Sequence, residues 1–240
     1  MNVAIVLAGG KGQRMDSEIP KQFINVYDKP ILMYTLEAFE NHPQIDAIEV
    51  VAIEGWGDLV WAYAKQFNIT KLKWVVDGGN TVQESIRNGL LNIENEVSSD
   101  DIILVHDGIR PLVDQDVLTD VIKVAYDKGN AVSSMPYNEQ IFVIDSENEE
   151  TTKEYVVRET IRRVSTPQAY NATMIIDLYK RAFLEEKGIS GSSYADTLMT
   201  EYGQSVFYSM GSDKNIKIID QDDLNLFKAF LQKENANWLK

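Results

Sequence analysis

A glycine-rich segment near the amino terminus, LAGGKGQRM, carries the first side chains that could do chemistry. Its glycines follow an apolar run, at a point where a backbone without side chains can approach a phosphate closely. Lys11 and Arg14 lie inside the segment, and Lys21 follows in the sequence PKQF. Because several cations beside such a loop can neutralise phosphate oxygens, the segment is suited to a triphosphate.

The spacing of these glycines excludes two common phosphate-binding motifs. A dinucleotide fingerprint needs a third glycine where this sequence has Met15. A P-loop needs a Gly-Lys-Ser/Thr sequence, whereas Gly12 is followed by Gln13. For the loop taken alone, a tight turn with solvated cations is the alternative interpretation.

The composition of the chain narrows its class. With 240 residues it can bury a sizeable core, and its 44% hydrophobic and 25% charged residues are ordinary for a globular protein. It has no cysteine and two histidines, which excludes disulfides, thiolate chemistry and a histidine-rich metal site. No apolar run is long enough to span a bilayer, and no basic region precedes the first apolar segment. We therefore expect a cytoplasmic protein.

The charge of the chain bears on its partners. The formal net charge is −14, and both nucleic acids and anionic membranes require a cationic surface. We therefore expect neither as a partner. An acidic protein that concentrates cations around one loop is suited to a small anion.

Apolar runs alternate with amphipathic segments along the first half of the chain, as in repeated βαβ units. We expect strands at residues 3–7, 45–53, 72–76, 101–105 and 131–135. One helix is expected to begin at Pro30, and three further helices to cover residues 56–67, 81–93 and 114–126. This order predicts an α/β fold with a Rossmann-like, mostly parallel sheet and helices on both faces.

The pattern changes between residues 137 and 166. Two extended segments, 140–145 and 155–157, are joined by an acidic stretch and predict a protruding β-arm. Such a hairpin has little core of its own and would be stabilised by a second subunit, so we expect a homodimer. A solvated loop is the alternative. The whole chain, 1–240, is expected to be a single nucleotidyltransferase domain with 137–166 as its dimerisation arm.

The last part of the chain returns to the α/β pattern. Asn171 is placed to cap a helix over residues 174–183, and Asp220 to cap one that runs to about Lys233. We also expect a helix over residues 193–202 and strands over residues 205–210 and 216–219.

Polar and charged residues repeatedly follow the predicted strands. They include residues 78–80, Asp107 with Arg110, and Asn215 with Lys217. The carboxyl ends of parallel strands share one edge of a sheet, where α/β proteins bind their ligands. We therefore expect these side chains to meet the glycine-rich loop in one crevice.

Several ordered motifs together resemble a known family. The sequences LAGGKGQRM, PKQF, DGG with SIRNGL, VHDGIRP, STPQAY and GSDKNIKI are similar to those of cytidylyltransferases that make CDP-linked sugar alcohols. That family acts on 2-C-methyl-D-erythritol 4-phosphate or D-ribitol 5-phosphate. The resemblance runs from Val3 to about Leu226 and implies attack of a polyol phosphate oxygen on the α-phosphorus of CTP, with release of pyrophosphate.

The resemblance also implies roles for residues on the nucleotide side. Arg14 and Lys21 would hold the triphosphate and its developing charge, and Lys217 would lie beside the α-phosphate, so these three are the expected catalytic residues. The expected nucleotide-binding residues are Leu7, Ala8, Gly9, Gly10, Lys11, Gly12, Gly79, Asn80 and Ser85.

On the acceptor side the resemblance implies a metal and a contribution from the partner subunit. Asp107 would lie near Mg²⁺, or another divalent cation, and near the hydroxyls of the substrate. Arg110 would orient the acceptor, and Arg158 would reach the acceptor phosphate from the arm of the partner. Gln140 and Asp196 complete the expected acceptor-binding set.

The sequence departs from the family pattern mainly on the acceptor side. A threonine expected after an aspartate at the start of the arm is replaced by Gln140, which follows Glu139. A Thr-Asp pair expected before the late helix is Ala195-Asp196, and a glycine expected after Arg-Met is Asp16. Gln140 offers an amide to a longer polyol, whereas Ala195 offers only space.

These residues lead to one hypothesis with three alternatives. The leading hypothesis is a CTP-dependent cytidylyltransferase for ribitol 5-phosphate or a related polyol phosphate, which serves cell-wall teichoic acid or capsule synthesis. Within the same class, the acceptor could be 2-C-methyl-D-erythritol 4-phosphate of isoprenoid synthesis. Outside it, the chain could be a catalytically silent CTP-binding regulator. A sugar-nucleotide enzyme that uses UTP or another base is the third alternative.

Overall fold

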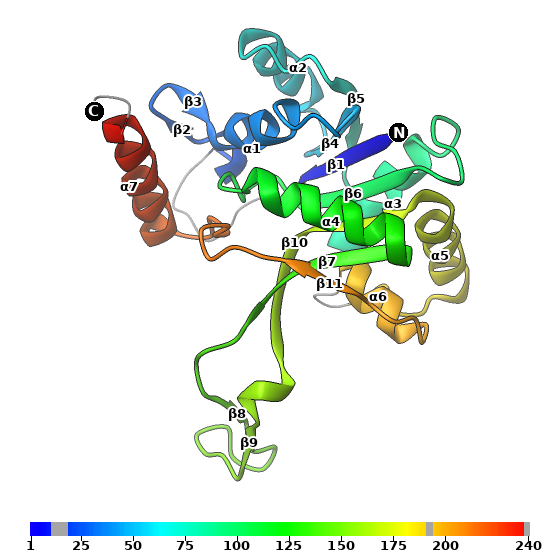
Figure 1. The fold of residues 1–240 in the computed structure, drawn as a ribbon, viewed down its shortest axis with the longest axis vertical. Coiled ribbons are helices and arrows are strands. Elements are labelled where there is room, and N and C mark those ends of the chain that lie inside the picture. Colours follow the sequence, from blue (N-terminus) through cyan, green and yellow to red (C-terminus); the bar gives the residue numbers. More distant parts are fainter. Residues whose placement is uncertain (11–18, 191–193, 238–240) are drawn as a thin grey trace.

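The computed structural model describes residues 1–10, 19–190 and 194–237, and its centre is a seven-stranded sheet (Figure 1). The strand order is β11-β7-β10-β6-β1-β4-β5. The strands are β1 (Asn2–Ala8), β4 (Ala47–Ala52), β5 (Leu72–Asp77), β6 (Ile102–Asp107), β7 (Asn130–Pro136), β10 (Arg162–Asn171) and β11 (Tyr208–Met210). All neighbouring pairs are parallel except those that include β10, which runs antiparallel to both β6 and β7.

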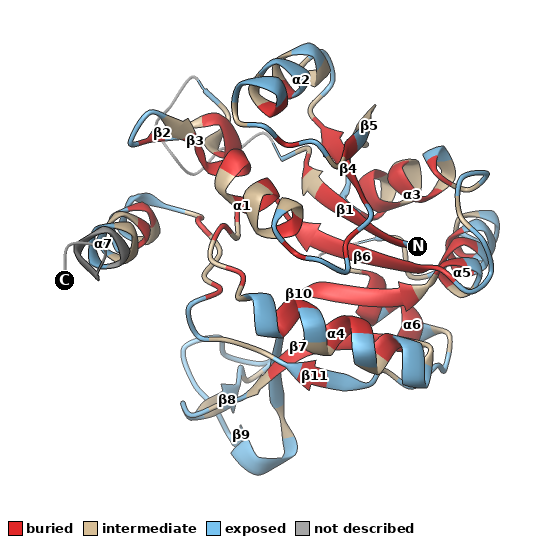
Figure 2. Cartoon of the chain, turned by 45° about the horizontal axis from the view of Figure 1, so that its top comes forward, coloured by how far each residue is buried: buried red, intermediate tan, exposed pale blue. Residues whose placement is uncertain are grey.

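Helices cover both faces of this sheet (Figure 2). They are α1 (Ile31–Glu40), α2 (Gly57–Gln66), α3 (Val82–Asn92), α4 (Gln115–Lys128), α5 (Ala172–Glu185), α6 (Ala195–Glu201) and α7 (Gln221–Asn237). Side chains along β1 alternate between two buried clusters. Ala4 and Val6 pack with α1, α2 and α4, whereas Val3 and Ile5 pack with α3, α5 and α6. The period of two along a strand sends these neighbours to opposite faces, which confirms the predicted α/β class.

Strand β10 was absent from the sequence prediction. Its sequence RRVSTPQAYN is polar and contains Pro167, a residue that the centre of a sheet rarely tolerates. The structure accommodates the proline at an irregularity, because the pairing of β10 with β7 shifts between Ser165 and Gln168. The second half of β10 is buried because it pairs with β6 on one side and β7 on the other. The local sequence gives no sign of these pairings.

The segment predicted as a strand at residues 216–219 is not a strand in the structure. It makes a backbone hydrogen bond from Ile218 N to the carbonyl of Ile109, at 2.9 Å, and Ile109 lies in a loop. Ile218 is fully buried in a cluster that includes Phe227 of α7. The apolar pattern there reflects packing under a helix, which a short sequence cannot distinguish from strand pairing.

Other bounds differ less from the prediction. The strand expected at 205–210 is shortened to β11, and α6 begins at Ala195. Ser193, where this helix was expected to begin, lies outside the described residues. Four short elements were not predicted: η1 (Lys21–Phe23), β2 (Asn25–Val26), β3 (Lys29–Pro30) and η2 (Arg158–Thr160).

A hairpin projects from the sheet between β7 and β10, as Figure 1 shows. It consists of β8 (Ile141–Val143) and β9 (Glu154–Val156), which pair antiparallel, and of η2 (Arg158–Thr160). These residues are mostly exposed in the single chain (Figure 2). Among the described helices, none combines the length and the apolar character that a bilayer span requires.

Candidate active site

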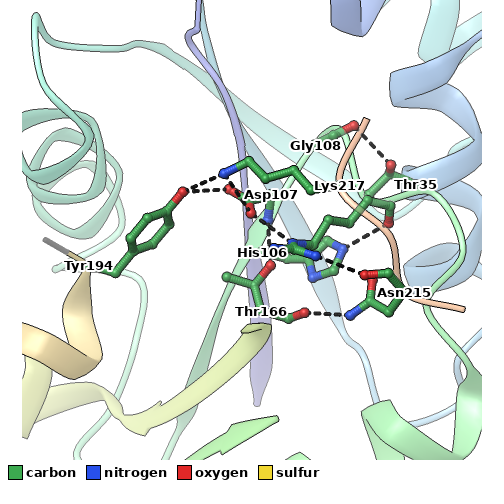
Figure 3. A network of polar contacts seen from close by, with 9 residues as sticks. Thr35, His106, Asp107, Gly108, Thr166, Tyr194, Asn215 and Lys217 are labelled. Atoms are coloured by element: carbon green, nitrogen blue, oxygen red, sulfur yellow. Dashed lines mark hydrogen bonds and ion pairs between the residues drawn. The ribbon is translucent and has the colours of Figure 1, made fainter. Parts of the chain in front are cut away.

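Asp107, the last residue of β6, is the hub of a charged cluster at the carboxyl edge of the sheet (Figure 3). Its Oδ2 accepts a hydrogen bond from Arg110 Nε at 2.9 Å and lies 3.2 Å from Lys217 Nζ. Arg110 and Lys217, which come from two separate loops, thus meet at the carboxylate of the strand residue Asp107. The structure therefore brings together three of the residues that the sequence placed in one crevice.

The charges of this cluster are set by its neighbours. Burial alone would raise the pKa of Asp107, but the positive charges of Lys217 and Arg110 outweigh burial and lower that pKa. Burial likewise opposes the charged form of Lys217, yet Asp107 and then Tyr194 raise the pKa of the lysine. Asp107 is therefore a carboxylate and Lys217 an ammonium at neutral pH. An ammonium held in this way is a preorganised positive charge for a reacting phosphate.

Tyr194 joins the same cluster, and sequence reasoning missed it. Its hydroxyl accepts a hydrogen bond from Lys217 Nζ at 2.7 Å and donates one to Asp107 Oδ1 at 3.2 Å (Figure 3). A lone tyrosine in a polar segment carries no signal of its own, since tyrosines are common in cores. Its position immediately before the departure Ala195-Asp196 was the one available sign.

Hydrogen bonds to backbone groups hold the residues of the cluster in place. Arg110 also donates from Nη1 to the carbonyl of Asn215 at 2.8 Å, and the Asn215 side chain donates to the carbonyl of Thr166 at 2.6 Å. The hydroxyl of Thr166 accepts the backbone N–H of Asp107 at 3.1 Å. Thr166 lies in the motif STPQAY and Asn215 in GSDKNIKI, so two of the recognised motifs serve to hold the VHDGIRP loop.

His106 contributes to this scaffold as a neutral side chain. It is fully buried, and burial lowers its pKa to about 4. Its Nε2 donates to the carbonyl of Arg110 at 3.1 Å, which closes the turn after β6. Gly108 in that turn lies so close to β1 that an added Cβ would be 2.9 Å from the carbonyl oxygen of Leu7. Only glycine fits there.

The nucleotide side of the predicted site is built mainly from backbone. Ser85 on α3 accepts the N–H of Gly79 at 3.0 Å and donates to the carbonyl of Thr81 at 2.9 Å. A Cβ added to Gly78 would lie 3.0 Å from Ser85 Oγ, and one added to Gly9 would lie 3.5 Å from the same atom. The two glycine segments and Ser85 therefore meet at the ends of β1 and β5. The Asn80 N–H is turned to Glu84 Oε2, at 2.6 Å.

The end of β1 connects this side to the charged cluster. Leu7 is the register partner of Asp107, and its carbonyl accepts the N–H of Gly108 at 2.8 Å. The side-chain amide of Gln22 donates to the carbonyls of Ala8 at 2.6 Å and Gly10 at 3.1 Å. Gln22 is 1% exposed, so the motif PKQF fixes the first part of the glycine loop. Both halves of the predicted site thus share one edge of the sheet.

Some of the predicted site residues lie outside the residues that the structure describes, and others lie away from this cluster in the single chain. Lys11, Gly12 and Arg14 lie outside the described residues. Lys21 begins η1, directly before the buried pair Gln22 and Phe23.

Gln140 directly precedes β8 and Arg158 begins η2, so both belong to the arm, which projects away from the sheet (Figure 1). Arg158 donates to the carbonyl of Asn138 at 3.2 Å and pairs with Glu159 at 3.4 Å, both within the arm.

Asp196 lies in the first turn of α6, two residues after Tyr194. It is 8% exposed, and burial raises its pKa against the hydrogen bonds from Thr197 and Gln168. Ala195 is fully buried beside it. The hydroxyl that the family pattern places at residue 195 is therefore absent, and the hydroxyl of the preceding residue, Tyr194, faces Asp107 and Lys217 instead.

A divalent cation could be held here by one protein carboxylate. Over residues 1–10, 19–190 and 194–237, no group of three or more acidic or histidine side chains is arranged to bind a metal. Mg²⁺ in nucleotide sites is commonly bound by one or two carboxylates, with phosphate oxygens and water as the other ligands. The ionised Asp107 fits an ion that arrives with a triphosphate, and its Oδ1 accepts a hydrogen bond of 3.2 Å from Tyr194.

Comparisons with known proteins agree with this geometry. The family model of IspD, 2-C-methyl-D-erythritol 4-phosphate cytidylyltransferase, matches residues 2–233. A ribitol-5-phosphate cytidylyltransferase of Lacticaseibacillus paracasei is 51% identical over 98% of this chain and 99% of its own. A 2-C-methyl-D-erythritol 4-phosphate cytidylyltransferase of Clostridium botulinum is 35% identical over 97% of this chain and 98% of its own.

The fold is also that of solved relatives. The crystal structure of 4-diphosphocytidyl-2C-methyl-D-erythritol synthase from Anaerococcus prevotii superposes with a TM-score of 0.80, covers 96% of each chain and is 22% identical. The match along nearly the whole sequence, the shared architecture and the charged cluster at the sheet edge lead to one assignment. The chain belongs to the IspD family of cytidylyltransferases and is a nucleotidyltransferase.

Proposed function

We propose that this enzyme transfers CMP from CTP to ribitol 5-phosphate or a related polyol phosphate and releases pyrophosphate. The observation that carries the proposal is the Asp107, Arg110 and Lys217 cluster beside the glycine loop. The choice of acceptor rests on the relative at 51% identity, which is named for ribitol 5-phosphate. A second such relative, from Vibrio parahaemolyticus, is 38% identical over 98% of this chain. We infer a cytoplasmic enzyme of one domain, because CTP is a cytoplasmic substrate.

The reaction is a displacement at phosphorus that requires no protein nucleophile. An oxygen of the acceptor phosphate forms a bond to the α-phosphorus of CTP as the bond from that phosphorus to the bridging oxygen of the β-phosphate breaks. The electron pair of the broken bond leaves with pyrophosphate, and the product is the CDP-alcohol. Negative charge concentrates around the α-phosphate on the way, so the protein contributes alignment and positive charge.

In the proposed site, Lys217 supplies positive charge beside the α-phosphate, and Arg14 and Lys21 hold the rest of the triphosphate. The backbone of residues 7–12 and the residues Gly79, Asn80 and Ser85 form the nucleotide pocket. Support comes from the two glycine segments, which meet at Ser85: an added Cβ would lie 3.0 Å from its Oγ at Gly78 and 3.5 Å from it at Gly9.

The acceptor is proposed to bind on the other side of Lys217. Asp107 accepts hydrogen bonds from hydroxyl groups of the polyol and would hold Mg²⁺, or another divalent ion, which would neutralise phosphate charge when bound. Arg110 uses both its Nε and its Nη1 inside the protein. We therefore propose that it orients the acceptor through Asp107. Asp196, which is buried near Gln168, supports the same pocket from below.

The assay that tests the function is pyrophosphate release from CTP and Mg²⁺ with a panel of acceptors. The panel contains ribitol 5-phosphate, other pentitol phosphates and 2-C-methyl-D-erythritol 4-phosphate. We expect the highest kcat/KM with ribitol 5-phosphate. The methylerythritol substrate is the second candidate, because the matching family model and the Clostridium botulinum relative carry its name. Replacing CTP with UTP, ATP or GTP in the same assay tests the choice of base.

A silent regulator would behave differently in this experiment. It would bind CTP by calorimetry and release no pyrophosphate with any acceptor. That result would contradict the proposed function, whereas a preference for another polyol phosphate would change only the acceptor.

We further propose that the arm assembles a homodimer and brings Arg158 and Gln140 to the acceptor site of the partner. Phe142, Ile144 and Tyr155 of the hairpin are 55%, 67% and 71% exposed, although each is large and apolar. The arm also lines an open pocket of about 480 Å³, to which Gln140 and Arg158 contribute. Exposed apolar surface of this kind is typical of a protein interface.

The oligomeric state provides one test of the arm. Tyr155→Asp should convert a dimer to a monomer in gel filtration with light scattering, because it places a charge in the apolar interface. Leu184→Asp is the matched control, since Leu184 is 85% exposed on α5, outside the arm. A monomeric wild-type protein would contradict the dimer.

Mixing two inactive variants tests whether the arm acts in the partner. Arg158→Ala has an intact sheet edge, and Asp107→Asn has an intact arm. In a mixed dimer, one site combines the intact edge of the first chain with the intact arm of the second. Random exchange in an equal mixture should restore about a quarter of the wild-type sites if the arm crosses the twofold axis. If Arg158 serves its own chain, mixing restores nothing.

A further inference from the structure

The hydroxyl of Tyr194 lies between the two opposite charges at the centre of the proposed active site (Figure 3). It is 2.7 Å from Lys217 Nζ and 3.2 Å from Asp107 Oδ1, whereas the direct approach of Lys217 to Asp107 Oδ2 is 3.2 Å. The shortest of the three contacts is thus the one from the ammonium to the tyrosine. The lysine also lies over the tyrosine ring, 5.3 Å from its centroid.

The backbone of Tyr194 is fixed independently of this contact. Its N–H donates to Thr197 Oγ1 at 2.7 Å, and the Thr197 hydroxyl donates back to the carbonyl of Tyr194 at 2.8 Å. The same carbonyl accepts a hydrogen bond from Gln83 Nε2 at 3.2 Å. Gln83 is 1% exposed and is in turn held by the hydroxyl of Tyr179 at 2.5 Å. The phenol is therefore presented to the site from a rigid support on α3 and α6.

Lysine needs such a support more than the other charged residues of the cluster. Its side chain has a flexible stem of four carbons, and its charge is concentrated on one ammonium group that lacks the planar, forked geometry of a guanidinium. Arg110 is fixed at two positions, by Asp107 and by the carbonyl of Asn215. Lys217 is 28% exposed along its side chain and comes from a segment without regular secondary structure. A charge at a reacting phosphate is effective only if it is already in place when the reaction begins.

We propose that Tyr194 is a positioning residue that holds the Lys217 ammonium, through its hydroxyl, at the place where the α-phosphate reacts. The proposal rests on the proposed function and adds a residue to it. Tyr194 acts through Lys217, whose ammonium it holds beside Asp107, and does not itself take part in bond making. Its hydroxyl bridges the nucleotide-side charge and the acceptor-side carboxylate, so the relative positions of the two groups are set before substrates bind.

The first test removes only the hydroxyl. Tyr194→Phe keeps the ring and its packing, and it should lower kcat roughly ten- to a hundredfold, as expected for loss of a hydrogen bond to a charged group. The Kd for CTP, measured by calorimetry, should stay within about twofold of wild type, because the lost contact matters during the reaction and not in nucleotide binding. Tyr202→Phe is the control, since its hydroxyl donates to Glu185 at the surface, and it should retain wild-type kcat.

The second test asks whether the effect passes through Lys217. In a Lys217→Ala background, Tyr194→Phe should have no further effect on kcat, because the group that it positions is gone. Tyr194→Leu, which also removes the ring, should likewise lower kcat in the wild-type background and not in the Lys217→Ala background. A general structural defect would instead lower kcat by the same factor in both backgrounds. Thermal unfolding of each variant shows that the compared proteins are folded.

The outcomes separate this role from the function on which it rests. A wild-type rate for Tyr194→Phe, or an effect of equal size in both backgrounds, would overturn the role of Tyr194 and leave the cytidylyltransferase in place. Absence of pyrophosphate release by the wild-type enzyme with every acceptor would remove the proposed function, and this role with it. A loss that disappears in the Lys217→Ala background supports the proposal.

Discussion

Two buried carboxyl groups in the central sheet have opposite properties. Asp107, at the carboxyl end of β6, is 6% exposed, and Glu49, in the middle of β4, is fully buried. Asp107 is surrounded by Arg110, Lys217 and Tyr194. Glu49 accepts one hydrogen bond, from Asn92 Nδ2 at 2.7 Å, and its second oxygen has no hydrogen-bond partner in the part of the chain that the structure describes.

The difference shows that burial alone does not determine whether a carboxyl group is charged. Burial raises the pKa of Glu49 to about 8, and the hydrogen bond from Asn92 offsets only part of that effect. Around Asp107 the neighbouring cations reverse the effect of burial and lower the pKa. The carboxyl end of β6 therefore holds a charged carboxylate, whereas β4 holds a neutral acid in the core. Gly89 of the motif SIRNGL lies against Glu49, since an added Cβ would be 3.1 Å from its Oε2.

Removal of Lys217 should produce the largest effect of the variants considered below. Lys217→Ala removes the ammonium from Asp107 and from the reacting phosphate, and we expect kcat to fall at least a hundredfold, since one preorganised charge at a transition state contributes roughly 3 kcal/mol. The measurement is steady-state pyrophosphate release. Lys214→Ala is the matched control, because Lys214 is exposed on the same segment, 3.6 Å from Asp114. A near-wild-type rate for Lys217→Ala would remove it from catalysis.

Glu49 should make the stability of the fold depend on pH. Its pKa is about 8 in the folded protein against a usual value of 4.5, so unfolding between these pH values releases a proton. Its contribution is therefore fully present below about pH 4.5 and is lost as the pH rises toward 8, by about 1.4 kcal/mol for each pH unit.

Glu49→Gln should flatten this dependence. Chemical denaturation between pH 5 and 9 measures the free energy of unfolding. As the pH rises, the free energy of unfolding of the variant should increase relative to that of the wild type. Glu96→Gln, at an exposed position, should follow the wild-type profile. Equal pH dependence of the wild type and Glu49→Gln would show that Glu49 is ionised in the folded protein.

A smaller effect is expected where the charge near Asp107 is kept but its geometry is changed. Arg110→Lys retains a cation but cannot contact Asp107 and the carbonyl of Asn215 at once, as Nε and Nη1 of the arginine do. We expect kcat to fall about tenfold, equivalent to about 1.4 kcal/mol. The pyrophosphate assay measures this, and an unchanged rate would mean that positive charge alone maintains the site.

Much of the fold followed from local pattern. The parallel strands were predicted because each is a short apolar run between helices, and the glycine segments because loops at strand ends have a recognisable composition. From these, the meeting of Asp107 and Arg110 with the glycine loop followed, since parallel strands end at one edge, whereas Lys217 reaches Asp107 from a segment that is not a strand. The structure agrees with that convergence.

Two features could not be predicted from the sequence, for the same reason. Strand β10 is polar and contains Pro167, and it is a strand because β6 and β7 pair with it from both sides. Tyr194 belongs to the site because α3 and α6 hold its backbone opposite Lys217. Neither is encoded by a local pattern, since each depends on contacts between residues far apart in the chain.

The sequence by itself determined the strands of the first half of the chain, where their polar ends lie and which family the chain belongs to. Those properties depend on short-range periodicity and on ordered motifs, which are readable one segment at a time. Only the tertiary structure decided which carboxyl group is charged and which hydroxyl faces Lys217. The physical reason is that the pKa and the position of a side chain depend on its neighbours in space, and for Asp107 these come from three separate parts of the chain.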